Sequence, residues 1–177
     1  EESAVSLVWV KVEPEASVDY EDAEGQLCVF TAPDVYVDST IGQECLDEGC
    51  GFENNPFKTI TRALEMINPT ESNPITIHLA AGTYSPETGE TFPINMMSNV
   101  NIEGEDEETT ILDAMQTDRV IFMVSCHDNT ISSITIMGGL AEGSFSLNSF
   151  FDNIDGYGGG GMYLFYSHPT LNNVIIT

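Results

Sequence analysis

The stretch TISSITI at residues 130–136 returns 40 positions later as TLNNVII at residues 170–176. A partial match at residues 97–102 precedes the first copy by 34 positions. Both full copies have the order apolar-x-x-apolar-x-apolar, and the last two apolar side chains then lie on the same side of an extended strand. Similar strands that return at irregular intervals predict the stacked coils of a solenoid, because a single coil needs neighbours above and below to bury its core.

The repeated order also predicts which aliphatic side chains point into the solenoid. We expect Ile102, Ile136 and Ile176 to be near neighbours in one ladder, and each such burial contributes roughly 1.5–3 kcal/mol. The last residues, 175–177, lie inside a repeat strand, which predicts a solenoid that is truncated on its C-terminal side. The expected inward positions are Ile77, Leu79, Val100, Ile102, Ile134, Ile136, Val174 and Ile176.

The charge of the chain restricts its partners. Acidic residues outnumber basic ones by 29 to 4, for a net charge of −25. Nucleic acid is excluded as a partner because phosphate backbones are bound by clustered Lys and Arg. Anionic membranes and polyanionic sugars would be repelled for the same reason. The charge fits solubility in a salty medium, binding of divalent cations, or attraction to basic partners. No apolar run reaches 18 residues, so we expect no transmembrane helix.

The cysteines bear on the compartment. Cys28, Cys45, Cys50 and Cys126 allow three full pairings. Cys45 and Cys50 flank a short acidic loop, and we predict a local disulfide between them. Zinc binding is disfavoured because no second close Cys or Cys/His pair completes a ligand set. A disulfide, together with a chain that starts at Glu1 without an apolar leader, predicts a processed secreted protein or an internal fragment from an oxidising, extracellular compartment.

Residues 1–33 form the first of two predicted parts. Residues 4–12 and 26–32 have strand composition, and the acidic, turn-prone segment between them predicts a β-hairpin. A two-stranded hairpin is marginal alone, so it should pack on something. We favour a cap over the end of the solenoid; the alternative is an edge strand offered to a neighbouring subunit.

A single amphipathic helix is predicted near the start of the second part, residues 34–177. Asn55 and Pro56 are typical of an N-cap and a first helical position, and Asn68-Pro69 ends the pattern. The predicted helix, from about Pro56 to Ile67, covers the N-terminal end of the solenoid. Its apolar face consists of Phe57, Ile60, Leu64 and Ile67.

An ordered set of short motifs identifies a family resemblance. The set comprises YVD at 36–38, NPFKTI at 55–60, AL at 63–64, AGTY at 81–84, NVNIEG at 99–104 and TILDA at 110–114. In order and spacing these resemble the start of the pectin-lyase-like right-handed parallel β-helix proteins. The closest resemblance is to a bacterial branch whose N-terminal domain has no assigned function. GGGGMY at 158–163 and SHPTL at 167–171 resemble coil repeats of large secreted and surface β-helix proteins.

The resemblance implies an all-β right-handed parallel β-helix with an N-terminal capping α-helix, but it does not imply catalysis. The Asn-Thr-Asp, Asp-Asp, Gly-His-Gly and Arg-Ile-Lys series of polygalacturonase-like hydrolases is absent. Lyase-like members use a basic residue beside calcium carboxylates, and past residue 60 the only cations are Arg62 and Arg119. We therefore predict no catalytic residue here and a non-catalytic segment for adhesion, envelope architecture or filament assembly. The alternatives are a calcium-assisted polysaccharide lyase with its active coils downstream, and a carbohydrate-binding module.

Two acidic segments are candidate calcium sites because calcium prefers several hard oxygen ligands. Asp38, Asp47 and Glu48 surround the Cys45–Cys50 loop, and Asp152 and Asp155 lie in a Gly-rich segment. The alternatives are a solvated, disulfide-closed loop for the first and a projecting Gly-rich loop for the second. The second segment lacks the 12-residue order of an EF-hand.

The segment 140–160 interrupts the solenoid rhythm and is rich in aromatic residues. These side chains could stack on sugar rings or dock a partner, or they could fold back over the coil. Outside this segment, His78 alternates with Ile77 and Leu79, which predicts a surface-facing histidine with no nucleophile placed beside it. The candidate ligand or partner residues of the segment are Phe145, Phe150, Phe151 and Tyr157.

Overall fold

The computed structural model describes residues 8–10 and 27–29 as backbone, and residues 32–42, 50–141 and 159–177 in full. Twelve strands, one α-helix and one short 3-10 helix lie in these ranges. They are β1 (Val8–Val10), β2 (Leu27–Val29), β3 (Asp34–Val37), α1 (Ile60–Met66), β4 (Ile75–Leu79), β5 (Gly82–Tyr84), η1 (Pro86–Thr88), β6 (Ile94–Asn95), β7 (Val100–Gly104), β8 (Thr110–Asp113), β9 (Ile121–Val124), β10 (Thr130–Met137), β11 (Met162–Phe165) and β12 (Thr170–Ile176).

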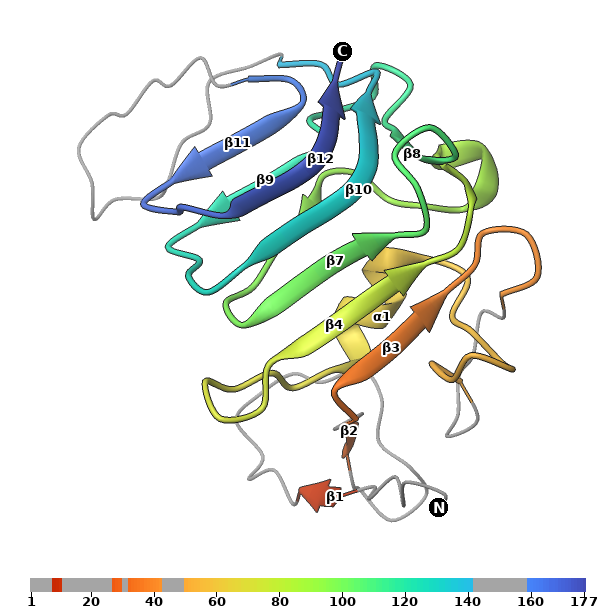
Figure 1. The fold of residues 1–177 in the computed structure, drawn as a ribbon, viewed down its shortest axis with the longest axis vertical. Helices are drawn as coiled ribbons and strands as arrows, with labels where there is room; N and C mark the ends of the chain where they lie inside the picture. Colours follow the sequence, from red (N-terminus) through yellow and green to blue (C-terminus); the bar gives the residue numbers. More distant parts are fainter. Residues whose placement is uncertain (1–7, 11–26, 30–31, 43–49, 142–158) are drawn as a thin grey trace.

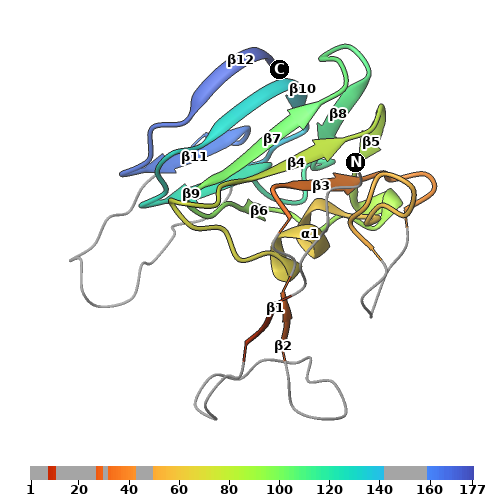
Figure 2. The ribbon, with the colours of Figure 1, turned by 60° about the horizontal axis from the view of Figure 1, so that its bottom comes forward.

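From β3 onward the strands of successive coils pair in parallel and form the three sheets, or faces, of a β-helix (Figures 1 and 2). The first face contains β3, β4, β7 and the first half of β10. The second contains β5, β8 and the second half of β10, and β12 follows β10 along its whole length. The third contains β6, β9 and β11. The fold is the predicted all-β, right-handed parallel β-helix.

Long strand β10 bends from the first face to the second at Ser133. This residue has a left-handed φ of 55°, and Asn173 of β12 has a φ of 50°. A left-handed residue turns the chain without breaking the strand, so one strand belongs to two faces. In the earlier coils the first and second faces are formed by separate strands, β4 and β5 or β7 and β8. In the coil of β10, one bent strand serves both faces.

Aliphatic side chains from successive coils stack inside. Val35, Ile77, Ile102 and Ile131 stand in register on β3, β4, β7 and β10, and all four are fully buried. Six of the eight predicted inward residues are buried, from Ile77 to Ile136. The other two, Val174 and Ile176, occupy inward positions on the last strand, where Val174 is half-buried and Ile176 is exposed.

The predicted ladder was wrong at Ile102. Ile136 pairs with Ile176, as expected, but Ile102 pairs with Ile131 on β10. Ile136 instead lies beside Leu112 of β8. The physical reason is the bend at Ser133, which sends the second half of β10 onto another face. Ile102 and Glu103 therefore align with the second and third positions of the repeat, Ile131 and Ser132.

The capping helix is shorter than predicted, because its expected first turn is used for strand pairing. Asn55 and Phe57 form isolated β-bridges; the Phe57 amide donates to the Tyr36 carbonyl of β3, and the Phe57 carbonyl accepts from the amide of Asp38. The helix therefore starts at Ile60, after an N-cap at Thr59 whose hydroxyl accepts from the Arg62 amide. The predicted apolar face is confirmed: Phe57, Ile60, Leu64 and Ile67 are all buried. In Figure 2, α1 lies at the β3 end of the coils.

A carboxylate distant in the sequence completes this cap. Glu90, which is buried, accepts from the Ile60 amide at 2.6 Å and the Thr61 amide at 3.1 Å. The Thr61 hydroxyl donates to it at 2.7 Å. The first amides of a helix have no partner within the helix, so a carboxylate there satisfies them and lies favourably at the positive end of the helix dipole.

The remaining structural predictions concern the N-terminal hairpin and the pairing of the cysteines. β1 and β2 pair antiparallel, in agreement with the expected hairpin; its role as a cap stays a prediction. Cys50 is disulfide-bonded. Cys45 lies outside the described residues, so the pairing with Cys50 also stays a prediction. Cys126 is a free, buried cysteine, and burial raises the pKa of its thiol.

Candidate functional site

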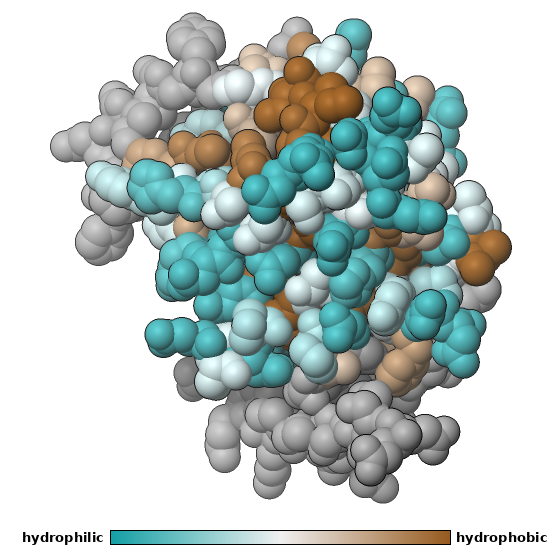
Figure 3. Space-filling view, in the orientation of Figure 1, coloured by the Kyte–Doolittle hydropathy of each residue, from teal (hydrophilic) through white to brown (hydrophobic). Residues whose placement is uncertain are grey.

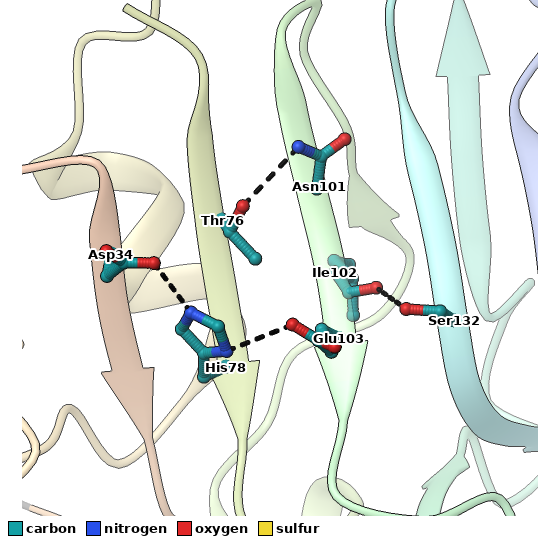
Figure 4. Close-up of polar contacts among 7 residues, drawn as sticks. All are labelled: Asp34, Thr76, His78, Asn101, Ile102, Glu103 and Ser132. Atoms are coloured by element: carbon teal, nitrogen blue, oxygen red, sulfur yellow. Dashed lines mark hydrogen bonds and ion pairs between the residues drawn. The ribbon is translucent and has the colours of Figure 1, made fainter.

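The outer surface of the first face carries a cluster of polar side chains, which we call the polar ladder (Figure 4). It arises from strand alternation: inward residues such as Ile77 and Ile102 leave their neighbours pointing outward. The parallel register then places outward residues of successive coils beside one another. The members are Asp34, Tyr36, Thr76, His78, Asn101, Glu103 and Ser132.

His78 of β4 lies at the centre of the polar ladder and contacts the two neighbouring strands, β3 and β7. Its Nε2 lies 2.8 Å from Oδ1 of Asp34 on β3, and its Nδ1 lies 3.3 Å from Oε2 of Glu103 on β7. The ring also stacks on Tyr36, with centroids 5.0 Å apart and an interplanar angle of 23°. Both ring nitrogens therefore have carboxylate partners, and one imidazole links three successive coils.

The rest of the ladder is joined by cross-strand hydrogen bonds. The Asn101 amide donates to the Thr76 hydroxyl at 3.4 Å, and the Ser132 hydroxyl donates to the Ile102 carbonyl at 3.3 Å. The Asn101 carbonyl oxygen accepts from the Thr130 backbone amide at 2.9 Å. These contacts join neighbouring coils along the axis of the β-helix. The polar side chains outside therefore stabilise the same stacking of coils as the apolar side chains inside.

Replacing His78 by Ala is expected to weaken the stacking of β3, β4 and β7. The loss should be about 1 kcal/mol, because partly exposed ion pairs and cross-strand pairs each contribute up to about that much. Urea unfolding of the wild type and the variant measures it. Thr76→Val, which removes a single weak hydrogen bond on the same strand, is the matched control and should lose less. Equal stability of all three proteins would contradict a linking role for His78.

A second group lies on the outward-facing side of the third face, where Tyr163 is buried and Phe122 is half-buried. Phe122 of β9 stacks on Tyr163 of β11, with centroids 5.0 Å apart and an interplanar angle of 10°. The Arg119 guanidinium lies 5.5 Å from the Tyr163 centroid and 3.9 Å from a carboxylate oxygen of Asp118. It is buried, and its Nε and Nη2 atoms have no hydrogen-bond partner among the residues that the structure describes. We call Arg119, Phe122 and Tyr163 the aromatic group.

The structure places one of the five candidate calcium ligands. Partial burial of Asp38 would raise the pKa of its carboxyl, but hydrogen bonds from the Thr40 hydroxyl and the amides of Thr40 and Ile41 outweigh this and lower it. Asp38 therefore stabilises its turn at neutral pH, and this contribution is lost as the pH falls through its lowered pKa. Asp47, Glu48, Asp152 and Asp155 lie outside the described residues.

The other candidates fall largely outside the described residues. The four aromatic candidates of segment 140–160, Phe145, Phe150, Phe151 and Tyr157, are not among them.

Within the residues that are described, no group of three or more His, Cys, Asp or Glu side chains is placed to hold a metal ion. No helix in the described part of the chain is long and apolar enough to cross a membrane.

A family described as "Protein of unknown function (DUF1565)" matches residues 42–139, more than half of the chain. The chain belongs to this family. The DUF1565 match includes His78, Glu103 and the aromatic residue Phe122, whereas Asp34 precedes it and Tyr163 follows it. No curated protein sequence matches the chain significantly.

Two solved structures resemble the DUF1565 chain in fold. Pectin methylesterase PemA from Erwinia chrysanthemi superposes with a TM-score of 0.50 and 18% identity, over 83% of this chain and 44% of that one. A pectin methylesterase mutant in complex with a hexasaccharide gives a TM-score of 0.49 and 16% identity, over 81% and 43%. The chain spans less than half the length of either structure. At these identities the likeness shows the fold alone, a pectin-lyase-like β-helix.

Sequence reasoning found His78 but missed its partners. Glu103 lies in β7 and contacts His78. Asp34 is the first residue of β3 and contacts the other ring nitrogen of His78. Alternation indicates that both partners point outward, because Asp34 directly precedes the inward residue Val35 and Glu103 directly follows the inward residue Ile102. The step that was missing is the register between β3, β4 and β7, which only the pairing supplies.

Proposed function

We propose that this chain is a non-catalytic structural segment of a secreted or cell-surface protein, used for adhesion or for envelope or filament assembly. Its described coils would act as a rigid scaffold that carries binding surfaces on its outer faces. The pectin-lyase-like fold is compatible with this role, although the fold itself does not determine a function.

The observation that carries the proposal is the engagement of both nitrogens of His78. A general base needs one nitrogen directed at the proton it removes, while a carboxylate holds the other. Here Asp34 and Glu103 occupy both nitrogens, so the imidazole would have to break a contact before it reached a substrate. The group is built to hold coils together, which is the property required of a scaffold.

An activity assay on acidic polysaccharide tests the proposal. The purified chain is incubated with methylated and unmethylated pectin, with added calcium and with chelator, and unsaturated products and released methanol are measured. We expect both to equal those of a heat-denatured sample. Formation of either product by the native chain would show that the segment is an enzyme and would overturn the proposal.

A carbohydrate-binding role is the second candidate, and the aromatic group favours it. Phe122 is the half-buried member of the aromatic group, and a sugar ring can stack on an aromatic face. The structural neighbours, named as pectin methylesterases, support a saccharide as the class of ligand. Affinity electrophoresis in gels that contain neutral or acidic polysaccharide tests this role. Retardation that Phe122→Ala abolishes, and Val124→Ala on the same strand does not, would support it; unretarded migration in every gel would exclude it.

Calcium remains a proposed ligand of the Asp38, Asp47 and Glu48 segment. Binding to the folded state raises its stability by mass action, so millimolar calcium should raise the melting temperature relative to a sample with chelator. The double variant Asp47→Asn/Glu48→Gln should abolish the increase, whereas Asp152→Asn/Asp155→Asn tests the second segment independently. An unchanged melting temperature in the wild type would refute calcium binding at both places.

A further inference from the structure

The outward side of the first face is a polar sheet surface whose side chains stand in two adjacent rows. The strand register places Tyr36, His78 and Glu103 in one row. The neighbouring row contains Asp34 and, beside it on β4, Thr76. In Figure 3 the surface over β3, β4 and β7 is mainly hydrophilic, and Figure 4 shows the two carboxylates on either side of the imidazole.

Each of these two carboxylates uses only one of its oxygens on His78. Asp34 contacts the ring through Oδ1, and Glu103 contacts it through Oε2. Within the residues that the structure describes, the second oxygens, Oδ2 of Asp34 and Oε1 of Glu103, have no hydrogen-bond partner. The two side chains are 52% and 54% exposed. Two carboxylate oxygens on β3 and β7 are therefore available to donors from another molecule.

The strands of this face carry no Lys or Arg to neutralise the carboxylates. The described Lys and Arg residues are Lys58, Arg62 and Arg119, and none of them lies on β3, β4, β7 or β10. Arg62 pairs with Glu65 on α1, and Arg119 lies beside the third face. The net charge of −25 adds a long-range attraction for cations and a repulsion between copies of the chain. Charge therefore favours a cationic occupant over a second copy or an anionic polymer.

Tyr36 favours one kind of cation. Its ring is half-buried and stacks on His78. Burial raises the pKa of the Tyr36 phenol, and the carboxylates of Asp34 and Glu53 raise it further, so the negative potential of the face extends to this ring. A guanidinium is planar, stacks on aromatic rings and donates two parallel N–H groups to a carboxylate, whereas an ammonium is compact and strongly hydrated. The combination of ring and carboxylates therefore fits arginine better than lysine.

We propose that the outward side of the first face binds an arginine-rich segment of a partner protein through Asp34, Glu103 and the Tyr36 ring. This inference rests on the proposed scaffold function, because it names the kind of partner that an adhesive scaffold would hold. The two carboxylates lie on strands two places apart in the sheet, which separates them by about 10 Å. One segment with several arginines can therefore engage both, and added salt should weaken its binding by screening.

Binding of octa-arginine, octa-lysine and octaserine peptides to the purified chain tests the proposal, by isothermal titration calorimetry in about 50 and about 300 mM NaCl. Octa-arginine should bind most tightly and octaserine not at all. Asp34→Asn/Glu103→Gln should weaken octa-arginine binding by about tenfold or more, because two charge-assisted contacts are lost. Both substitutions keep an acceptor oxygen for His78. The control Glu71→Gln/Glu87→Gln removes the same charge from exposed residues elsewhere and should weaken binding by less than about twofold.

Three calorimetric results would overturn the proposal. Equal weakening in the two double variants would show that the peptide responds to net charge alone. Octa-lysine that binds as tightly as octa-arginine would remove the role of the Tyr36 ring, and no binding of octa-arginine would remove the site. Amide chemical shifts of the wild type provide a test that needs no variant. Octa-arginine should shift the amides of β3, β4 and β7, and shifts confined to other strands would place the peptide elsewhere and overturn the proposal.

Light scattering without peptide tests a second copy as the occupant. The wild type and Asp34→Asn/Glu103→Gln should have the same mass, and a dimer that this double variant abolishes would assign the face to a second copy and overturn the proposal. These results are separate from the activity assay. Pectin cleavage would refute the scaffold function without changing peptide binding, and an unbound peptide would refute the arginine site without producing activity.

Discussion

Replacing Glu90 by Ala is expected to destabilise the protein by about 3 kcal/mol, because it leaves one buried amide, one half-buried amide and a half-buried hydroxyl without their acceptor. Glu90 accepts from the Ile60 amide, the Thr61 amide and the Thr61 hydroxyl. These contacts join α1 to a segment 30 residues later in the chain, so their loss would detach the cap from the end of the solenoid. Urea unfolding measures the change in stability.

The conservative and control variants identify the cause. Glu90→Gln keeps one acceptor oxygen but directs an amide at a helix N–H, so it should lose about half as much as the Ala variant. Glu87→Ala, on the exposed η1 turn three residues earlier, should change stability by less than about 0.5 kcal/mol. Hydrogen exchange at Ile60 and Thr61 should accelerate most in Glu90→Ala, less in Glu90→Gln and not in Glu87→Ala. A Glu90→Ala protein as stable as Glu87→Ala would refute the capping role.

Gly104→Ala is expected to cost about 3 kcal/mol, because overpacking against backbone cannot relax as overpacking against a flexible side chain can. Gly104 ends β7, and a Cβ there would overlap the Ser133 carbonyl oxygen. It would also lie 2.7 Å from Cγ2 of Ile134 and 3.0 Å from Cβ of Thr110. The bend of β10 passes directly over this glycine, so the substitution acts on the residue that joins the first two faces.

Gly82→Ala is the matched control for Gly104→Ala. A Cβ at Gly82 meets only the Ser39 hydroxyl oxygen, at 2.9 Å, and a hydroxyl can rotate away. The control should therefore lose much less stability, and thermal unfolding of the two variants makes the comparison. Equal melting temperatures would show that the β10 bend can shift away from β7, contrary to the close approach described above.

The sequence was informative where the signal was local. Alternation on residues 75–79 correctly predicted which side chains of β4 face inward, and the spacing of Ile60 and Leu64 predicted the buried face of α1. It was misleading where one strand serves two faces. Residues 130–136 look like one uniform repeat, but the left-handed φ at Ser133 divides them between β7 and β8.

The candidate site was less predictable than the fold for a related reason. Alternation indicates that His78 and Glu103 point outward, but it does not indicate that they face each other. Their contact depends on the exact pairing of β4 with β7, and a shift of one residue would send one of the two side chains inward. The aromatic group likewise joins residues 41 positions apart, Phe122 and Tyr163, through the pairing of β9 with β11.

Local pattern was therefore sufficient for the class of the fold, the composition of the core and the presence of a cap, because burial depends on periodicity that each segment carries within itself. The neighbours of His78, the carboxylate that caps α1 and the exposed apolar side chains of the last coil were established only by the assembled helix. Each depends on which coil lies above which, and coils of unequal length conceal that register from any single stretch of the chain.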